Sequence, residues 1–240
     1  MKLDILVFAA HPDDAELSCS GTIALHVALG KKVGIIDLTE GELGTRGSVA
    51  QRYEEAAAAA KVLQLSAREN LQLADGFFTN DEASQRKLIE VIRRYQPDIV
   101  FANALIDRHI DHGKGAKLAH DACFLAGLRK VETLDKHTGQ AQASWRPRAV
   151  WHYIQDQWRN PDVVVDISAH WATKEAAIRA FKSQFYDPQS DEPTTPISTP
   201  DFMQFLESRA RDFGRLVGVT YGEGFEKATP VGVSQLTDLW

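Results

Sequence analysis

Two short clusters of histidine and aspartate stand out from the rest of this chain. The first, His11-Pro-Asp-Asp14, directly follows an apolar run over residues 5–10. The second lies in the segment "DRHIDHGKG", which begins at Asp107. Imidazole and carboxylate groups without clustered thiolates suit zinc or another divalent first-row metal. The residue types therefore predict metal-assisted chemistry.

The roles within these clusters follow from the ligand number of zinc. A catalytic zinc ion commonly takes three protein ligands, and His11, Asp14 and His112 can supply them. Asp13 would then stay off the metal and act as a general base, because adjacent side chains point in different directions. Two simpler interpretations remain open. His-Pro followed by an aspartate N-cap is a common helix start, and His109 and His112 could lie in a solvated loop.

Buried strands and helices must position these clusters. We expect strands over residues 4–10, 32–39, 71–74 and 98–103, and helices over 15–29, 49–65, 81–95 and 115–130. In the less regular second half we expect strands over 149–154 and 163–167, helices over 171–181 and 202–217, and an irregular proline-rich loop over 186–200. Continuously apolar strands that alternate with helices indicate a parallel sheet covered on both faces. The predicted fold class is therefore α/β, with a mostly parallel sheet and helices on both of its faces.

The position of both clusters after strands has a structural meaning. Open parallel sheets bind ligands beyond the carboxyl ends of their strands, where the strand order reverses. In the common order, that point lies between the first strand, which ends before His11, and the fourth, which ends at Asn103. The two clusters should therefore meet in space.

Composition limits the class of protein. The chain has 240 residues, 44% of them hydrophobic, a net charge of −6 and a pI of about 5.8. An acidic balance argues against binding to nucleic acid or to an anionic membrane, which both require a basic face. We see no membrane span and no signal-peptide pattern, so we expect a cytoplasmic protein. The two cysteines, Cys19 and Cys123, should be buried apolar residues.

Three motifs resemble those of the PIG-L/LmbE family of zinc-dependent N-acetylglucosamine deacetylases. They are "HPDDAE", "LTEGELGTRGS" with "RYEEAAAAAKVL", and "DRHIDHGKG". The resemblance implies a Rossmann-like fold, a zinc ion held by His11, Asp14 and His112, and Asp13 as the general base. It also implies that His109 stabilises the oxyanion.

The same resemblance suggests substrate contacts and a domain organisation. Arg52 matches a substrate-binding arginine of the family, and Arg108 and Asp111 are further candidates for substrate contact. We expect one deacetylase domain over 1–240, in which a Rossmann-like core over 1–130 carries the metal site and 131–240 completes the domain. Family members of the bacillithiol type form homo-oligomers, often hexamers, so we expect a homo-oligomer here.

Length and the segments "FKSQF" and "RARDFGRLVGVTYGEGF" most resemble the bacillithiol-pathway members, which deacetylate N-acetyl-glucosaminyl-malate. The alternatives are a deacetylase of chitobiose, of a mycothiol precursor or of an antibiotic intermediate, and a non-enzymatic sugar-binding module. A nucleotide-binding domain does not fit, because the glycine-rich segment lacks a phosphate-loop pattern.

Overall fold

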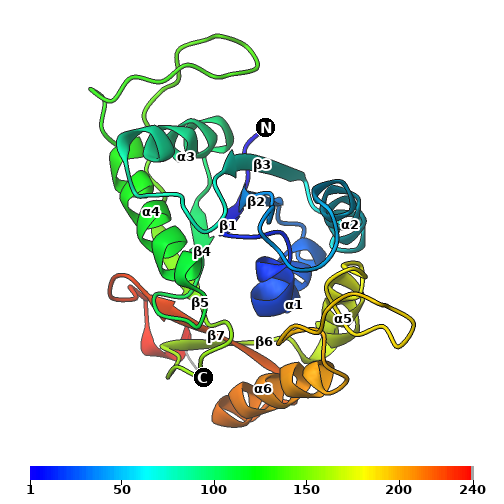
Figure 1. Ribbon diagram of the computed structural model, residues 1–240. Helices are drawn as coiled ribbons and strands as arrows, with labels where there is room; N and C mark the ends of the chain where they lie inside the picture. Colours follow the sequence, from blue (N-terminus) through cyan, green and yellow to red (C-terminus); the bar gives the residue numbers. More distant parts are fainter. Residues whose placement is uncertain (239–240) are drawn as a thin grey trace.

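The computed structural model describes residues 1–238 and contains a seven-stranded sheet with helices on both faces (Figure 1). The strands are β1 (Ile5–Ala9), β2 (Val33–Thr39), β3 (Ala67–Leu73), β4 (Ile99–Ala102), β5 (Ala149–Tyr153), β6 (Val163–Asp166) and β7 (Gly222–Lys227). The helices are α1 (Asp14–Ala28), α2 (Val49–Val62), α3 (Glu82–Tyr95), α4 (Ile110–Ala126), α5 (Trp171–Ile178) and α6 (Phe202–Val217), with short 3-10 helices η1 (Ser168–His170) and η2 (Leu236–Asp238). The expected α/β class is confirmed.

The strand order is β3-β2-β1-β4-β5-β7-β6. Strands β1 to β5 pair in parallel, while β7 runs antiparallel to both β5 and β6. Because β1 pairs with β2 on one side and β4 on the other, the strand order reverses between β1 and β4. This is the expected place for a ligand site in an open parallel sheet.

Alternate residues of β1 enter two different cores, which explains why the strand is apolar throughout. Leu6 and Phe8 pack in the cluster formed with α3 and α4. Ile5 and Val7 pack on the other face, with residues from α1 and α5. A parallel strand covered on both faces has no solvent-facing side. Polar residues therefore follow only beyond the end of the strand at Ala9.

Strand β3 is longer than expected and begins among polar residues. Its Arg68 side chain is only 9% exposed and donates to both carboxylate oxygens of Asp37, over 2.9 and 3.1 Å. The same guanidinium also donates to the fully buried Glu16. The polar part of β3 is therefore neutralised inside the protein, which an apolar pattern could not reveal.

We expect Arg68→Met to lower the free energy of unfolding by about 3–5 kcal/mol, because it leaves two buried carboxylates without their cation. Urea unfolding of the purified protein measures this. Arg86→Met is the control: Arg86 makes an exposed helical pair with Glu82, so the loss should stay below about 1 kcal/mol. Equal losses in both variants would contradict the assignment of Arg68 as a buried counter-ion.

Two further differences affect the second half of the sheet and the site. Strand β7 is not predicted, because its sequence GEGFEK has glycines where a strand would normally show apolar or β-branched residues. A Cβ on Gly222 would lie 2.9 Å from the backbone nitrogen of Gly214 and one on Gly224 3.0 Å from the Phe213 ring, both in α6, so α6 can approach the sheet only over glycine. Helix α4 begins at Ile110 rather than at Gly115, since the His109 side chain accepts a hydrogen bond from Asp111 N–H at the helix start.

Two smaller expectations concern the cysteines and the membrane. Cys19 and Cys123 are both buried free thiols, as expected. Within residues 1–238, no helix has the length and apolar character needed to cross a membrane.

Candidate active site and metal centre

The two histidine/aspartate clusters meet at the carboxyl ends of β1 and β4. His11 follows β1, and His112 lies in the first turn of α4. Asp14, the first residue of α1, lies between them: its carboxylate is 3.5 Å from His11 Nδ1 and 3.1 Å from His112 Nε2. The expectation that the clusters converge is confirmed.

Each of these histidines is oriented by a second carboxylate. His11 Nε2 lies 2.9 Å from Asp75 Oδ1, and His112 Nδ1 is hydrogen bonded to Asp107. A carboxylate on one ring nitrogen fixes the tautomer and leaves the other nitrogen available to a metal. In both rings the available nitrogen is the one that faces Asp14.

Asp14 is held as a charged carboxylate. It accepts hydrogen bonds from the His11 backbone N–H, from Asn103 and from Gln155, over 2.9, 3.0 and 3.1 Å. Burial by itself would raise the pKa of Asp14, but the charges and hydrogen bonds of His112 and His11 outweigh it and hold this pKa well below its usual range. Asp14 is therefore ready to bind a cation at neutral pH.

Three overlapping ligand sets contain His11. In two of them the ligand atoms all lie within 4.8 Å of one another: His11 with His109 and His112, and His11 with Asp75 and Asp111. In the second of these sets the Asp111 carboxylate is already hydrogen bonded within the protein. It accepts from Lys114 at 3.1 Å and from the Gly76 N–H at 2.7 Å. The third set is the predicted one, with Asp14 between His11 and His112. Two imidazoles and one carboxylate in this arrangement suit a zinc-type ion.

Asp13 differs from Asp14 in both conformation and ionisation. Its backbone has φ 120°, in the region that favours glycine, and such strain is found where the surrounding structure imposes it, often at functional sites. Burial raises the pKa of Asp13 to about 7, although the nearby charge of Arg52 lowers it. A carboxylate that titrates near neutral pH is well suited to general-base catalysis.

Arg52 is buried beside Asp13. Its guanidinium donates to Gln184 and to the Pro12 carbonyl, both over 2.6 Å, and lies 3.5 Å from the Asp13 carboxylate. It does not pair with Glu55, which accepts instead from Ser183. Two of its nitrogens are thus already bound within the protein, which favours a role in holding the Asp13 loop.

His109 lies against both candidate metal-binding histidines, with ring centroids 4.6 Å from His11 and 5.2 Å from His112. Its Nδ1 accepts from the Asp111 N–H, so its ring proton resides on Nε2. Burial and the charges of His11 and His112 lower the pKa of His109. The carboxylates of Asp14 and Asp111 act in the opposite direction but are outweighed.

Asp111, an expected substrate contact, lies inside the protein. Its side chain is fully buried, and its carboxylate accepts hydrogen bonds from Gly76 and Lys114 and lies 3.5 Å from His11 Nε2. These contacts favour a role in orienting His11. Arg108, in contrast, lines the pocket, is half-exposed and donates to Asp156 over 2.8 Å.

The site opens into a pocket of about 400 Å³. Its walls include the glycine-rich loop after β2, Thr195 to Ile197 of the proline-rich loop, and Arg209 of α6. Sequence reasoning missed Asp75, Gln155, Gln184 and Arg209. Asp75 and Gln155 each follow the carboxyl end of a strand, so the rule that found His11 could have found them too. Gln184 lies in "FKSQF" and Arg209 begins "RARDFGRLVGVTYGEGF", so the resemblance of these two segments was the signal that could have found them.

Comparison with known proteins agrees with this geometry. Residues 6–123, which include His11 and His112, match the PIG-L family model, described as GlcNAc-PI de-N-acetylase. The chain is 31% identical over 193 residues to the 4-oxalmesaconate hydratase of Pseudomonas putida, covering 75% of this chain and 73% of that one. It is 28% identical to the diacetylchitobiose deacetylase of Thermococcus kodakarensis, covering 92% and 81%.

Among solved structures, the conserved protein TT1542 of Thermus thermophilus superposes with a TM-score of 0.84 at 37% identity, covering 96% of this chain and 97% of that one. The likeness therefore extends over both halves of the sheet. By its motifs, its sequence relatives and its fold, the chain belongs to the PIG-L family.

Proposed function

We propose that this protein hydrolyses the acetamide of an N-acetylglucosaminide, releasing acetate and a free amine. The observation that carries the proposal is the buried Asp13 carboxylate, which lines one pocket together with the His11–Asp14–His112 cluster. Support also comes from a relative named diacetylchitobiose deacetylase, which acts on an N-acetyl sugar.

The chemistry divides between the metal and the chain. His11, Asp14 and His112 would hold a zinc-type ion, which when bound activates water and polarises an amide carbonyl. Asp13 accepts a proton from the attacking water and returns it to the departing amine. The neutral His109 would donate its Nε2–H to the oxyanion that develops on the carbonyl oxygen of the acetyl group.

His109→Ala is expected to lower kcat about 10²–10³-fold with unchanged metal content, because it removes one donor to the oxyanion. His109→Gln keeps an N–H donor and should recover part of the loss. Steady-state kinetics together with metal analysis of both variants test this. Loss of metal from His109→Ala would instead assign the residue to the ligand set with His11 and His112.

For the substrate, we propose N-acetyl-glucosaminyl-malate of bacillithiol biosynthesis, on the strength of the motif resemblance. We further propose zinc as the metal, a cytoplasmic location and a homo-oligomeric assembly. The seven-stranded sheet, which includes strands from both halves of the chain, supports treating residues 1–240 as one domain. Deacetylation of a different N-acetyl sugar is the principal alternative.

A second candidate function is the hydration of an unsaturated carboxylate. It is favoured by one observation, the 31% identity to a 4-oxalmesaconate hydratase. The same Asp13 could take a proton from water as hydroxide adds to one carbon of the double bond, and then deliver that proton to the other carbon. This reaction would release no amine, so the two candidates are separable in one set of assays.

The test combines metal analysis with four substrates. Purified protein is offered N-acetyl-glucosaminyl-malate, N-acetylglucosamine and diacetylchitobiose with detection of free amine, and 4-oxalmesaconate with detection of the lost double bond. Amine release that is fastest on the malate-bearing sugar supports the proposal. Hydration without amine release would replace it with the second candidate, and sugar binding without turnover would indicate a binding module.

A further inference from the structure

Arg209 is a partly buried arginine whose guanidinium is largely unused. It lies on α6 and lines the pocket that contains Asp13 and His11. One of its nitrogens donates to the Leu17 carbonyl over 3.0 Å. Among residues 1–238 Arg209 forms no ion pair with a carboxylate, although a guanidinium has several N–H donors to satisfy.

The other arginines of the pocket are already engaged. Arg46 donates to Ser183, Pro193 and Ser190 and so fastens the proline-rich loop. Arg52 donates to Gln184 and Pro12. These two side chains build the pocket wall, while Arg209, which lines the same cavity, donates only to the Leu17 carbonyl among residues 1–238.

Partial burial without a carboxylate is unfavourable for a cation, because the charge loses water and gains only the cation–π contact between the Arg209 guanidinium and the Phe205 ring, 5.8 Å apart. Desolvation accordingly lowers the pKa of Arg209, and the more distant charges of Asp156, Glu223 and Asp107 only partly oppose it. An anion that entered the pocket would supply the missing partner.

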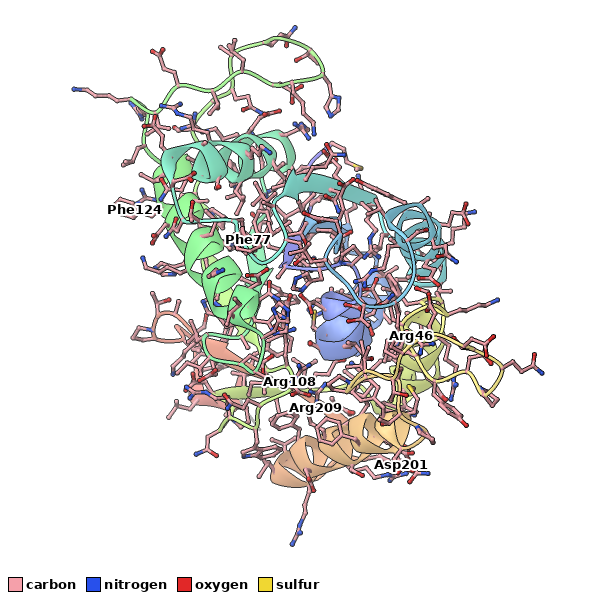
Figure 2. The ribbon with its side chains drawn as sticks, viewed as in Figure 1. Arg46, Phe77, Arg108, Phe124, Asp201 and Arg209 are labelled. Carbon is pink, nitrogen blue, oxygen red and sulfur yellow. The ribbon has the colours of Figure 1, made fainter. Side chains whose placement is uncertain are left out.

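Arg108 strengthens this part of the pocket. It lies in the segment before α4, and one of its nitrogens is held by Asp156 over 2.8 Å. Figure 2 shows Arg108 and Arg209 in the region between that segment and α6, and both line the same cavity. Phe202 and Leu206, from the same helix as Arg209, provide apolar surface beside it.

We propose that Arg209, assisted by Arg108, binds a carboxylate of the substrate and thereby selects anionic over neutral substrates. The inference rests on the proposed function, since it places this carboxylate on the substrate of the same site. It moves the recognition of the anion from Arg52, whose terminal nitrogens are bound within the protein, to the wall formed by α6.

The first measurement needs no turnover: calorimetric titration of the metal-loaded protein with L-malate. Arg209→Gln should weaken malate binding about 10- to 100-fold, the effect of losing a charged hydrogen-bonded contact. Arg209→Lys keeps the charge but loses paired hydrogen bonds, so it should fall between wild type and Arg209→Gln. Arg211→Gln is the matched control, because Arg211 is two residues further along α6 and pairs with Glu207 on the exposed surface.

The second measurement compares kcat/KM on N-acetyl-glucosaminyl-malate and on free N-acetylglucosamine. Arg209→Gln should lower the first about 10- to 100-fold and the second far less. An equal loss on both, or malate binding unchanged in both Arg209 variants, would overturn the inference. Tighter binding of inorganic phosphate than of malate would overturn the carboxylate assignment. If malate binds in an Arg209-dependent manner but no amine is released from either sugar, the proposed function fails while the anion subsite stands.

Discussion

Replacing Asp13 with asparagine is expected to lower kcat about 10²–10⁴-fold and to leave the metal content unchanged, because the change removes the base and preserves its shape. Asparagine tolerates positive φ better than most residues, so the strained backbone at φ 120° should survive. The measurement pairs amine-release kinetics with metal analysis of the same preparation.

Asp14→Asn is the informative control, because it changes the neighbouring carboxylate to the same amide. Asp14 lies between His11 and His112, so its replacement should weaken metal binding rather than remove the base. If Asp13→Asn loses its metal and Asp14→Asn keeps it, the two roles are reversed.

His112→Ala should abolish tight metal binding, reducing the content from about one ion per chain to a small fraction of that. The reason is geometric: His112 Nε2 faces Asp14, and Asp107 holds the opposite ring nitrogen. Asp107→Asn keeps the ligand and loses only its support, so metal affinity should fall about 10–100-fold. Metal analysis after dialysis, with titration of the stripped protein, measures both variants.

His137→Ala serves as the control for a general effect of removing a histidine, since His137 is exposed and lies on a connection away from the pocket. Its metal content should equal that of the wild type. Stoichiometric metal retained by His112→Ala would exclude the ligand set of His11, Asp14 and His112.

Most of the fold is predictable because its strands are covered on both faces. The apolar run before His11 leaves one interpretation, a central parallel strand, and the helices between strands leave little choice of connection. The edges of the sheet are different. Strand β3 carries the buried Arg68 and β7 carries two glycines that α6 packs against, so in both cases the side-chain pattern reflects a distant partner rather than the strand itself.

The same distinction applies to the site. The residue types and spacing of His11, Asp14 and His112 were sufficient to predict that they meet, since parallel strands place their carboxyl ends along one edge of a sheet. The difference in ionisation between Asp13 and Asp14, however, depends on the tertiary structure around them. Two adjacent aspartates are chemically identical in sequence. In the fold, burial raises the pKa of Asp13 against the opposing charge of Arg52, while His112 and His11 outweigh burial and hold the pKa of Asp14 low.

The sequence by itself therefore determined the central parallel part of the sheet, the meeting of the two clusters and the kinds of side chain that gather there, because these depend on local polarity and chain order. Only the tertiary structure decided that Asp111 is buried support, that Arg52 is bound beside Asp13 and that Arg209 retains free donors. These properties depend on what surrounds each charge. A charge's surroundings come from segments far apart in the chain, which no local pattern records.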